Sequence, residues 1–343
     1  MSSASDAEDR PVIDRLDPPA AIAGGSFELR GSNLSAPTEQ QPVVRFGKAA
    51  GRLIVGGSHR VVVSVPEDAA EGSITVQRNG QRSEAAHCSL GLAIAENLHP
   101  VANPAVDAEG NIYTTRSGSR GEKVPVSVFK IDLNFNLRPL VSEIINPTGL
   151  LVDPDGSLLV SGRHDGTIYS VDPNGQVEAY AEGMGVATGL AMDAAENLYV
   201  GDRTGTIFKI ARDRQIFVFA TLEPSISAYH LAFGPDGNLY VSGPTTSSYD
   251  PIYRVLPTGD VEVFRRGFGR PQGLTFDAAG RMYAACSYRG RKGVFRMSLD
   301  GDGEPELVVS GPGIVGQVLT KNGEMIVATA SSLYRVPGAG WLD

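Results

Sequence analysis

The chain reads GLLVD at residues 149–153, GLAMD at 189–193, HLAFG at 230–234, GLTFD at 273–277 and GQVLT at 316–320. These are five variants of one five-residue motif. A degenerate copy, NPAVD, stands at 103–107, and successive copies lie 40 to 46 residues apart. A repeat of this length built only from strand-like segments is typical of the blades of a β-propeller. Six copies predict six blades.

Each repeat continues as short strands separated by turn residues. After the phrase at 149–153, the turn residues PDG lead into SLLVS at 157–161, and DPNG at 172–175 leads into the outer strand QVEAY at 176–180. Asn-Gly and Asp-Gly supply the positive φ that tight hairpins need. The last repeat has only three such strands, and LGLAIAEN at 90–97 has the pattern of the missing outer one. We expect residues 90–98 to close the ring, because closure removes an open sheet edge.

The first ninety residues follow a different pattern. Residues 1–10 are polar and are expected to be disordered, whereas residues 11–89 contain short alternating strands separated by Gly, Pro and Asn turns, which is typical of a β-sandwich. The order of a Pro-rich first strand, the GG turn at 24–25, GSNL at 31–34 and VVRFG at 43–47 resembles the IPT/TIG immunoglobulin-like domain. That resemblance implies support or docking. The predicted fold is all-β, a sandwich at 11–89 and a six-bladed propeller at 90–343 that folds without residues 1–80.

Composition narrows the possible partners. The 343 residues carry a formal net charge of −9, which argues against nucleic acid or an anionic membrane as the partner. No segment approaches 18 uninterrupted apolar residues, so no membrane insertion is expected. Two cysteines, Cys88 and Cys286, stand 198 positions apart and do not indicate a disulfide framework. The first residues show no signal peptide, and a cytoplasmic location is expected, or a secreted or periplasmic one if a leader was removed.

The repeat also resembles a known group of propellers. PTGLLVDPDGSLLV at 147–160, followed by GTIYSV at 166–171, is similar to the NHL and gluconolactonase/senescence-marker-protein group over residues 90–343. The resemblance implies a divalent metal held by a Glu of an E-G-P motif with Asn and Asp. Here that motif reads Ala102-Asn103-Pro104, and the positions before the repeated glycine are not carboxylates: Thr148, Thr188, Tyr229, Gln272 and Val315. We therefore predict no metal or cofactor. The W-F-T-E strand end of streptogramin-lyase propellers is also missing.

The loops that leave the second strand of each blade are predicted to gather on one face of the ring. They differ in length and are rich in polar residues, which suits a binding surface on a rigid scaffold, although solvated loop tips would have the same composition. Arg163 and Arg203 belong to these loops. The predicted ligand-binding set is Arg116, Thr148, His164, Thr188, Asp202, Tyr229, His230, Tyr249, Gln272, Tyr288 and Arg289.

His230 replaces the small residue of the repeat at the channel mouth. It is the one candidate for a catalytic residue, as a general base or metal ligand, or else it fills space beside a backbone carbonyl. Two functions are carried forward. The first is a non-catalytic propeller that binds a small molecule, carbohydrate or protein, with the immunoglobulin-like domain as a spacer. The alternative is a lactonase-like hydrolase or a lyase around His230, which would use a divalent metal such as Ca²⁺, Mg²⁺ or Zn²⁺.

Overall fold

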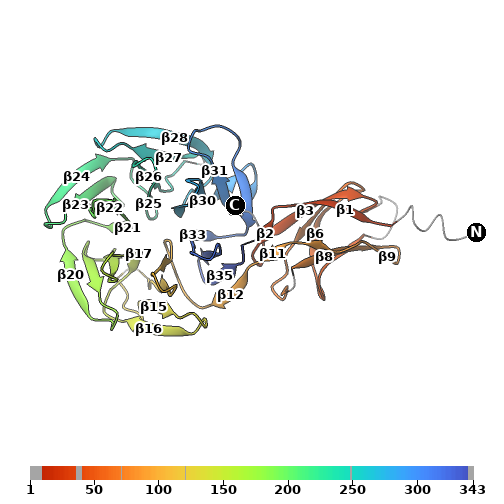
Figure 1. Ribbon diagram of the computed structural model, residues 1–343, viewed down its shortest axis with the longest axis horizontal. Helices are drawn as coiled ribbons and strands as arrows, with labels where there is room; N and C mark the ends of the chain where they lie inside the picture. The colour runs from red at the N-terminus through yellow and green to blue at the C-terminus, as the bar shows by residue number, and fades with distance from the viewer. Residues whose placement is uncertain (1–9, 36–40, 71, 120, 248, 339–343) are drawn as a thin grey trace, which may run out of the picture.

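The chain folds into β-strands that form a sandwich and a ring (Figure 1). The computed structural model describes residues 10–35, 41–70, 72–119, 121–247 and 249–338. Within these ranges there is no helix long and apolar enough to cross a membrane. The predicted all-β class, with a sandwich and a six-bladed propeller, is confirmed.

The sandwich consists of two sheets around one apolar core. Phe27 and Leu29 of the first sheet meet Phe46 and Ile74 of the second, so alternation along each strand places one face inside. The first sheet has the order β1 (Val12–Asp17), β3 (Ser26–Ser32), β7 (Arg60–Ser64), β6 (Arg52–Gly56), and the second has β10 (Ala86–His87), β8 (Ser73–Arg78), β4 (Val43–Phe46), β5 (Ala49–Ala50), with β9 (Gln81–Arg82) on β8.

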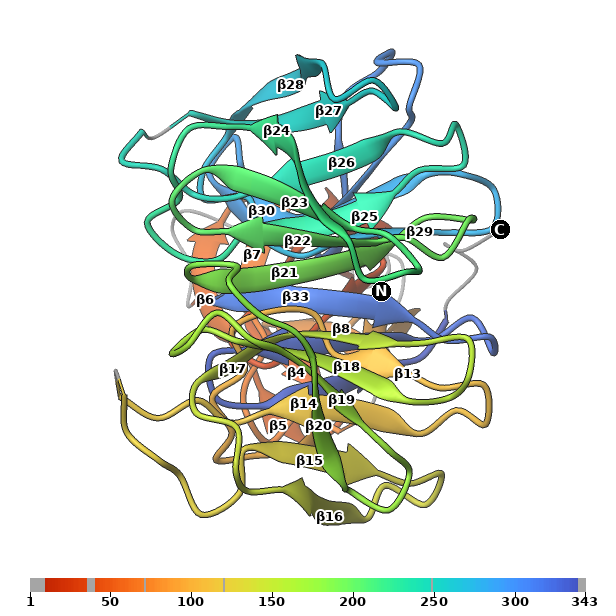
Figure 2. The same ribbon diagram turned by 90° about the vertical axis from the view of Figure 1, so that its left-hand side faces the viewer.

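Six antiparallel sheets, the blades, surround the axis of the ring in the described chain; Figure 2 shows them edge-on, with blades 2 and 3 toward the viewer. Blade 1 is β13 (Ala105–Val106), β14 (Ile112–Thr115), β15 (Val128–Ile131), β16 (Leu137–Val141); blade 2 is β17 (Pro147–Val152), β18 (Leu158–Gly162), β19 (Ile168–Val171), β20 (Val177–Ala181); blade 3 is β21 (Ala187–Met192), β22 (Leu198–Asp202), β23 (Thr206–Ile210), β24 (Ile216–Thr221). Blade 4 is β25 (His230–Phe233), β26 (Leu239–Ser242), β27 (Asp250–Val255), β28 (Val261–Phe268); blade 5 is β29 (Leu274–Phe276), β30 (Met282–Tyr288), β31 (Arg291–Met297), β32 (Glu306–Ser310); blade 6 is β33 (Ile314–Leu319), β34 (Met325–Thr329), β35 (Leu333–Val336) and β12 (Leu92–Ala95).

The ring closes as predicted. Strand β12 pairs antiparallel with β35, so a segment that precedes blade 1 in the sequence completes blade 6. The repeated glycines allow the innermost strands to converge. A Cβ on Gly189 would lie 2.4 Å from the carbonyl oxygen of Tyr229, and one on Gly149 would lie 2.4 Å from that of Thr188.

A repeated aspartate fastens the turn between the first and second strands of several blades. Asp193 accepts hydrogen bonds from the Asn197 amide and, at 3.1 Å, from the Tyr199 hydroxyl. Asp107 with Tyr113 and Asp277 with Tyr283 repeat the contact at 2.9 and 3.0 Å. In blade 2 the position of the tyrosine is taken by Leu159, so the aspartate there lacks this bond.

The sandwich is joined to the ring by a shared sheet. Strands β2 (Ala20–Ala21) and β11 (Ser89–Leu90) continue blade 5 beyond β32 in parallel pairing. Ile22 is 1% exposed and packs in the core between blades 5 and 6 with Tyr283 and Met325. The structure therefore changes the expectation that residues 1–80 are dispensable, because this segment supplies part of the propeller's own core.

Candidate functional site

A large cavity opens on the face of the ring where each blade's first strand begins and its second strand ends, here called the upper face. Pro147 at the start of β17 pairs with Gly162 at the end of β18, and Ala187 pairs with Asp202 in the same way, which defines this end. The cavity of about 1050 Å³ lies over blades 2 and 3. It is lined by Gly121, Asn146, Arg163, His164, Val186, Arg203, Thr204, Pro224 and Ser225. We call it the upper pocket.

Two arginines of the upper pocket occupy equivalent positions in adjacent blades. The backbone N–H of Arg163 donates to the Asn146 carbonyl at 3.1 Å, and that of Arg203 donates to the Val186 carbonyl at 3.0 Å. In each case the acceptor is the residue just before the blade's first strand. Ser287 is the matching residue of blade 5, because it lies three residues after Ala284, which pairs with Leu274 as Val160 pairs with Leu150 in blade 2. Ser117 matches in blade 1 by its place in the repeat, so neither blade has an arginine at this position.

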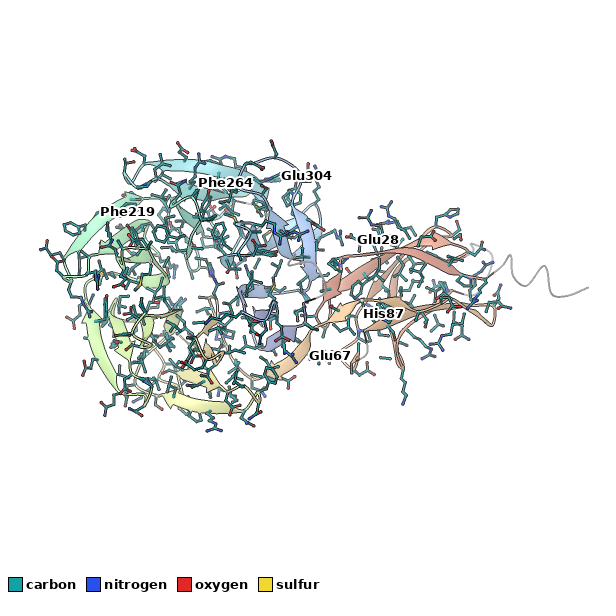
Figure 3. All side chains as sticks on the ribbon, viewed as in Figure 1. Glu28, Glu67, His87, Phe219, Phe264 and Glu304 are labelled. Atoms are coloured by element: carbon teal, nitrogen blue, oxygen red, sulfur yellow. The ribbon has the colours of Figure 1, made fainter. Side chains whose placement is uncertain are left out.

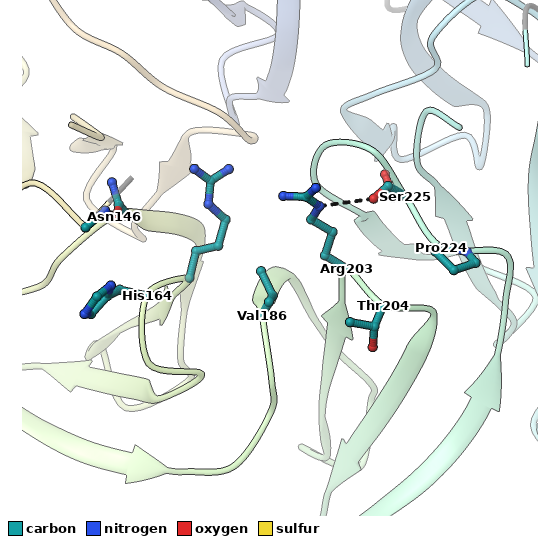
Figure 4. Close-up of a pocket in the computed structure, with 9 residues that line it drawn as sticks. Asn146, His164, Val186, Arg203, Thr204, Pro224 and Ser225 are labelled. Carbon is teal, nitrogen blue, oxygen red and sulfur yellow. Dashed lines mark hydrogen bonds between the residues drawn. The ribbon is translucent and has the colours of Figure 1, made fainter. Parts of the chain in front are cut away.

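Backbone and side-chain bonds hold Arg203 against the next loop. Its Nε donates to the Ser225 carbonyl at 3.2 Å, and the Ser225 N–H donates back to the Arg203 carbonyl at 3.0 Å. The Ser225 hydroxyl donates to the Pro244 carbonyl, which ties this loop to blade 4. Figure 4 shows Arg203, Ser225 and Pro224 on one side of the pocket, opposite Asn146 and His164. The guanidinium therefore has a defined orientation although its side chain is exposed.

Asn146 and Asp202 shape the walls. The Asn146 amide donates to the carbonyls of Gly118 and Ser119, and its oxygen accepts from the Gly121 N–H at 2.8 Å, so it binds the loop of blade 1 to blade 2. Asp202, from the predicted set, is 5% exposed and accepts from the Val186 N–H at 2.9 Å and from the Thr204 N–H and hydroxyl. Its carboxylate binds two residues of the lining, Val186 and Thr204, and is not part of the lining itself.

Four other members of the predicted set are enclosed within the ring. Thr148, Thr188, Tyr229 and His230 are all buried at the starts of innermost strands. The Thr188 hydroxyl donates to the Gly201 carbonyl and accepts from the Tyr229 N–H, and the Tyr229 hydroxyl donates to the Glu223 carbonyl. These hydrogen bonds connect blades 3 and 4, so the hydroxyl groups of Thr188 and Tyr229 already have partners within the protein.

His230 is 3% exposed and borders a void of about 30 Å³ near the axis. Its Nε2 has no hydrogen-bond partner among the described residues, and burial lowers the pKa of the imidazole to about 3. The void is of the size that holds one water molecule. His230 is therefore a neutral, enclosed ring, separated from the upper pocket.

The channel residues do not fit a divalent metal. Asn103 lies beside His230 in the void, but its side-chain oxygen accepts from the Gln317 N–H at 3.1 Å and its amide donates to the Leu274 carbonyl. Among the described residues no three His, Cys, Asp or Glu side chains gather in a metal-binding group. A hard cation needs several oxygen ligands, some of them charged, and this channel does not offer them.

The remaining predicted residues lie on the rim of the upper face. Tyr288 and Arg289 contact Glu304, at 2.5 and 2.9 Å, and Glu304 lies at the outer edge of the ring (Figure 3). Gln272 borders a separate cavity of about 200 Å³ over blade 5. Arg116 and Tyr249 are exposed, Tyr249 by 71%. In the described chain, only His164 of the predicted set lines the upper pocket. Arg163 and Arg203, which lie on the same loops and also line it, are outside the predicted set.

Comparisons with known proteins support the fold. No protein-family model matches the chain, and no curated protein matches its sequence. Among solved structures, an auxiliary nutrient binding protein from Bacteroides ovatus is 12% identical, with a TM-score of 0.56 over 96% of this chain and 98% of that one. A gluconolactonase from Xanthomonas campestris is 17% identical, with a TM-score of 0.60 over 73% and 90%. A virginiamycin B lyase from Staphylococcus aureus is 13% identical, with a TM-score of 0.53 over 92% and 99%. At these identities the likeness extends to the fold alone.

Proposed function

We propose that this protein is a non-catalytic propeller that binds a small molecule in the upper pocket. The observation that carries the proposal is a cavity of about 1050 Å³ whose walls come from connections of successive blades, each fixed by backbone hydrogen bonds. A concave site on a rigid scaffold is the usual location of ligand binding. The solved structures of similar fold include proteins described as nutrient binding, which is consistent with this role.

The sandwich has a supporting role in this proposal. It is attached beside blades 5 and 6, away from the pocket over blades 2 and 3 (Figure 1). Its sequence resemblance to IPT/TIG domains fits a spacer that presents the ring.

Filling the upper pocket tests the proposal. Val186 is half-buried and lies between the two sides of the pocket, so Val186→Trp places an indole in the binding volume. We expect native mass spectrometry to detect a bound small molecule after the protein is incubated with a metabolite extract, and expect Val186→Trp to abolish the adduct. Val263→Trp, on the exposed face of β28, is the matched control. An adduct that persists in a folded Val186→Trp protein places binding elsewhere and refutes the proposal.

A second candidate function rests on His230. Its unpartnered Nε2 beside a water-sized void is the feature expected of a hydrolase or lyase base, and solved structures of similar fold include both. Its 3% exposure weighs against this, because a substrate must reach the imidazole. Lactone or ester turnover that His230→Ala abolishes while folding is kept would favour this candidate.

A further inference from the structure

Another cavity opens on the upper face over blade 5, and we call it the blade 5 pocket. It has a volume of about 200 Å³ and lies where backbone segments run side by side. Gly269 bridges to Ser287, which pairs with Lys292. The Gly311 N–H donates to the Lys292 carbonyl at 3.1 Å. Among the described residues, its lining shares no member with that of the upper pocket, so the two cavities are separate sites.

The lining of the blade 5 pocket contains positive side chains and no negative one. Arg270 and Lys292 line it, and its described residues include no aspartate or glutamate. The whole chain has a net charge of −9, so the charge here is a local reversal of sign. A concave surface lined by one sign of charge raises the local concentration of ligands of the opposite sign.

Other cations of blade 5 are neutralised, whereas these two are not. Arg289 forms an ion pair with Glu304 at 2.9 Å, and Arg291 forms one with Asp17 at 2.5 Å. Within the part of the chain that the structure describes, the two lining cations have neither an ion pair nor a side-chain hydrogen bond. Their positive charge is therefore available to a ligand.

Two neutral donors of the blade 5 pocket are held by their backbone and have free side chains. The Gln272 N–H donates to the Ala285 carbonyl at 2.8 Å, and the Ser287 N–H donates to the Gly269 carbonyl at 2.9 Å. Neither the Gln272 amide nor the Ser287 hydroxyl has a hydrogen bond among the described residues. Ser287 lies directly opposite Lys292 in an antiparallel pair, so their side chains share one face of the sheet. The pocket thus offers four donor side chains without a protein acceptor.

We infer that the blade 5 pocket binds a tetrahedral oxyanion, phosphate or sulfate, either free or as the charged group of a small ester. Four unpartnered donors suit an anion whose oxygens accept several hydrogen bonds, and the guanidinium of Arg270 and the ammonium of Lys292 supply the charge-assisted ones. The volume lies below the roughly 300–1,000 Å³ typical of pockets for drug-sized ligands, so the bound species is small. The site is additional to the upper pocket and does not depend on the proposed function.

Titration calorimetry with matched anions, at low and at high salt, tests this inference. The probes are inorganic phosphate, sulfate and glycerol 3-phosphate, with acetate as a planar anion and glycerol as a neutral compound. We expect saturable binding of at least one tetrahedral anion, weaker binding of acetate and none of glycerol. The affinity should fall as salt rises, because both cations are exposed. Arg270→Gln and Lys292→Gln should each weaken binding by about tenfold or more, as expected for a lost charge-assisted hydrogen bond.

Two variants serve as controls and should bind the anion as the wild type does. Arg289→Gln removes the same charge from a residue that pairs with Glu304, and Val186→Trp fills the upper pocket. Three outcomes overturn the inference: no saturable binding of a tetrahedral anion, binding that Arg270→Gln and Lys292→Gln both leave unchanged, or binding that Val186→Trp abolishes. Acetate bound as tightly as phosphate would refute the tetrahedral class. Failure of the proposed function would appear separately, as a metabolite adduct that survives Val186→Trp.

Discussion

His230 shows how a single residue of a repeat changes the chemistry of the ring. The equivalent positions hold glycine in four other blades, at Gly149, Gly189, Gly273 and Gly316. The imidazole fills part of the axis that those glycines leave open, and it is buried without a partner for Nε2 among the described residues. Burial disfavours the charged form, which lowers the pKa of His230 to about 3.

This pKa predicts a specific dependence of stability on pH. The unfolded chain binds a proton at this imidazole below pH 6.5, whereas the folded protein binds it only near pH 3. His230 therefore destabilises the fold as the pH falls through this window, by about 1.4 kcal/mol for each pH unit. Urea unfolding of the wild type and of His230→Gln at pH 7 and pH 4.5 measures the effect. We expect the variant to lose less stability than the wild type on acidification; equal losses would show that the imidazole is not enclosed.

At the residue scale, the sequence predicted that polar loops gather on the upper face, but it did not predict which of their side chains line the cavity there. Arg116 and Arg163 both stand on second-strand loops, but Arg116 matches Gly162 in the repeat and Ser117 matches Arg163. A shift of one residue along a strand reverses the direction of the side chain. Two things decide which loop side chains meet over the cavity: such one-residue shifts in strand position, and the conformation of the loop before each first strand. Residue type alone reveals neither of them.

At the scale of the element, the repeated aspartate turn explains why these blades keep their register. Burial raises the pKa of Asp193, but hydrogen bonds from Asn197 and Tyr199 outweigh it and hold that pKa below its ordinary value. The ionised carboxylate therefore stabilises the blade above the pKa of the unfolded chain, and this contribution is lost as the pH falls through the lower folded pKa. The turn residues were readable in the sequence; the tyrosine contact was not, because it joins positions six apart across a hairpin.

Removing one hydroxyl measures this contact. Tyr199→Phe leaves the ring in place and deletes a hydrogen bond to a charged group, so we expect a loss of about 1.5 to 3 kcal/mol at neutral pH. The difference should shrink at strongly acidic pH, where Asp193 is protonated. Tyr180→Phe is the control, because the Tyr180 hydroxyl has no hydrogen bond within the described chain. Chemical denaturation that gives both variants the same free energy of unfolding would contradict this account.

At the scale of the whole molecule, the sandwich and the propeller share structure that the sequence did not reveal. The number of blades and the closing strand followed from the repeat, because each blade repeats the same local pattern. The seam between the modules rests on the two-residue strands β2 and β11, which are too short to leave a pattern. Parallel pairing of β2 with β32 covers the outer edge of blade 5, and the Asp17–Arg291 ion pair at 2.5 Å lies beside it.

Ile22 provides the sharpest test of this seam. Its side chain is 1% exposed and lies between blades 5 and 6, within contact range of Gly91 and Gly311. Ile22→Ala should lower the free energy of unfolding by about 2 to 5 kcal/mol, the usual cost of a buried cavity of this size. Ile54→Ala, on a side chain of the sandwich that is 53% exposed, should change stability by less than about 0.5 kcal/mol.

Deletion of residues 1–80 extends the same reasoning. The truncated chain keeps β11 and the closing strand β12 but loses β2 and Ile22, which uncovers the edge of β32 and part of the propeller core. An uncovered, apolar sheet edge promotes association between chains. We therefore expect the truncated protein to melt at a lower temperature and to aggregate in light scattering, whereas a chain that begins at residue 10 should behave as the full protein does. A truncated ring that is monomeric and melts with the full chain would show that the propeller core is complete without the sandwich.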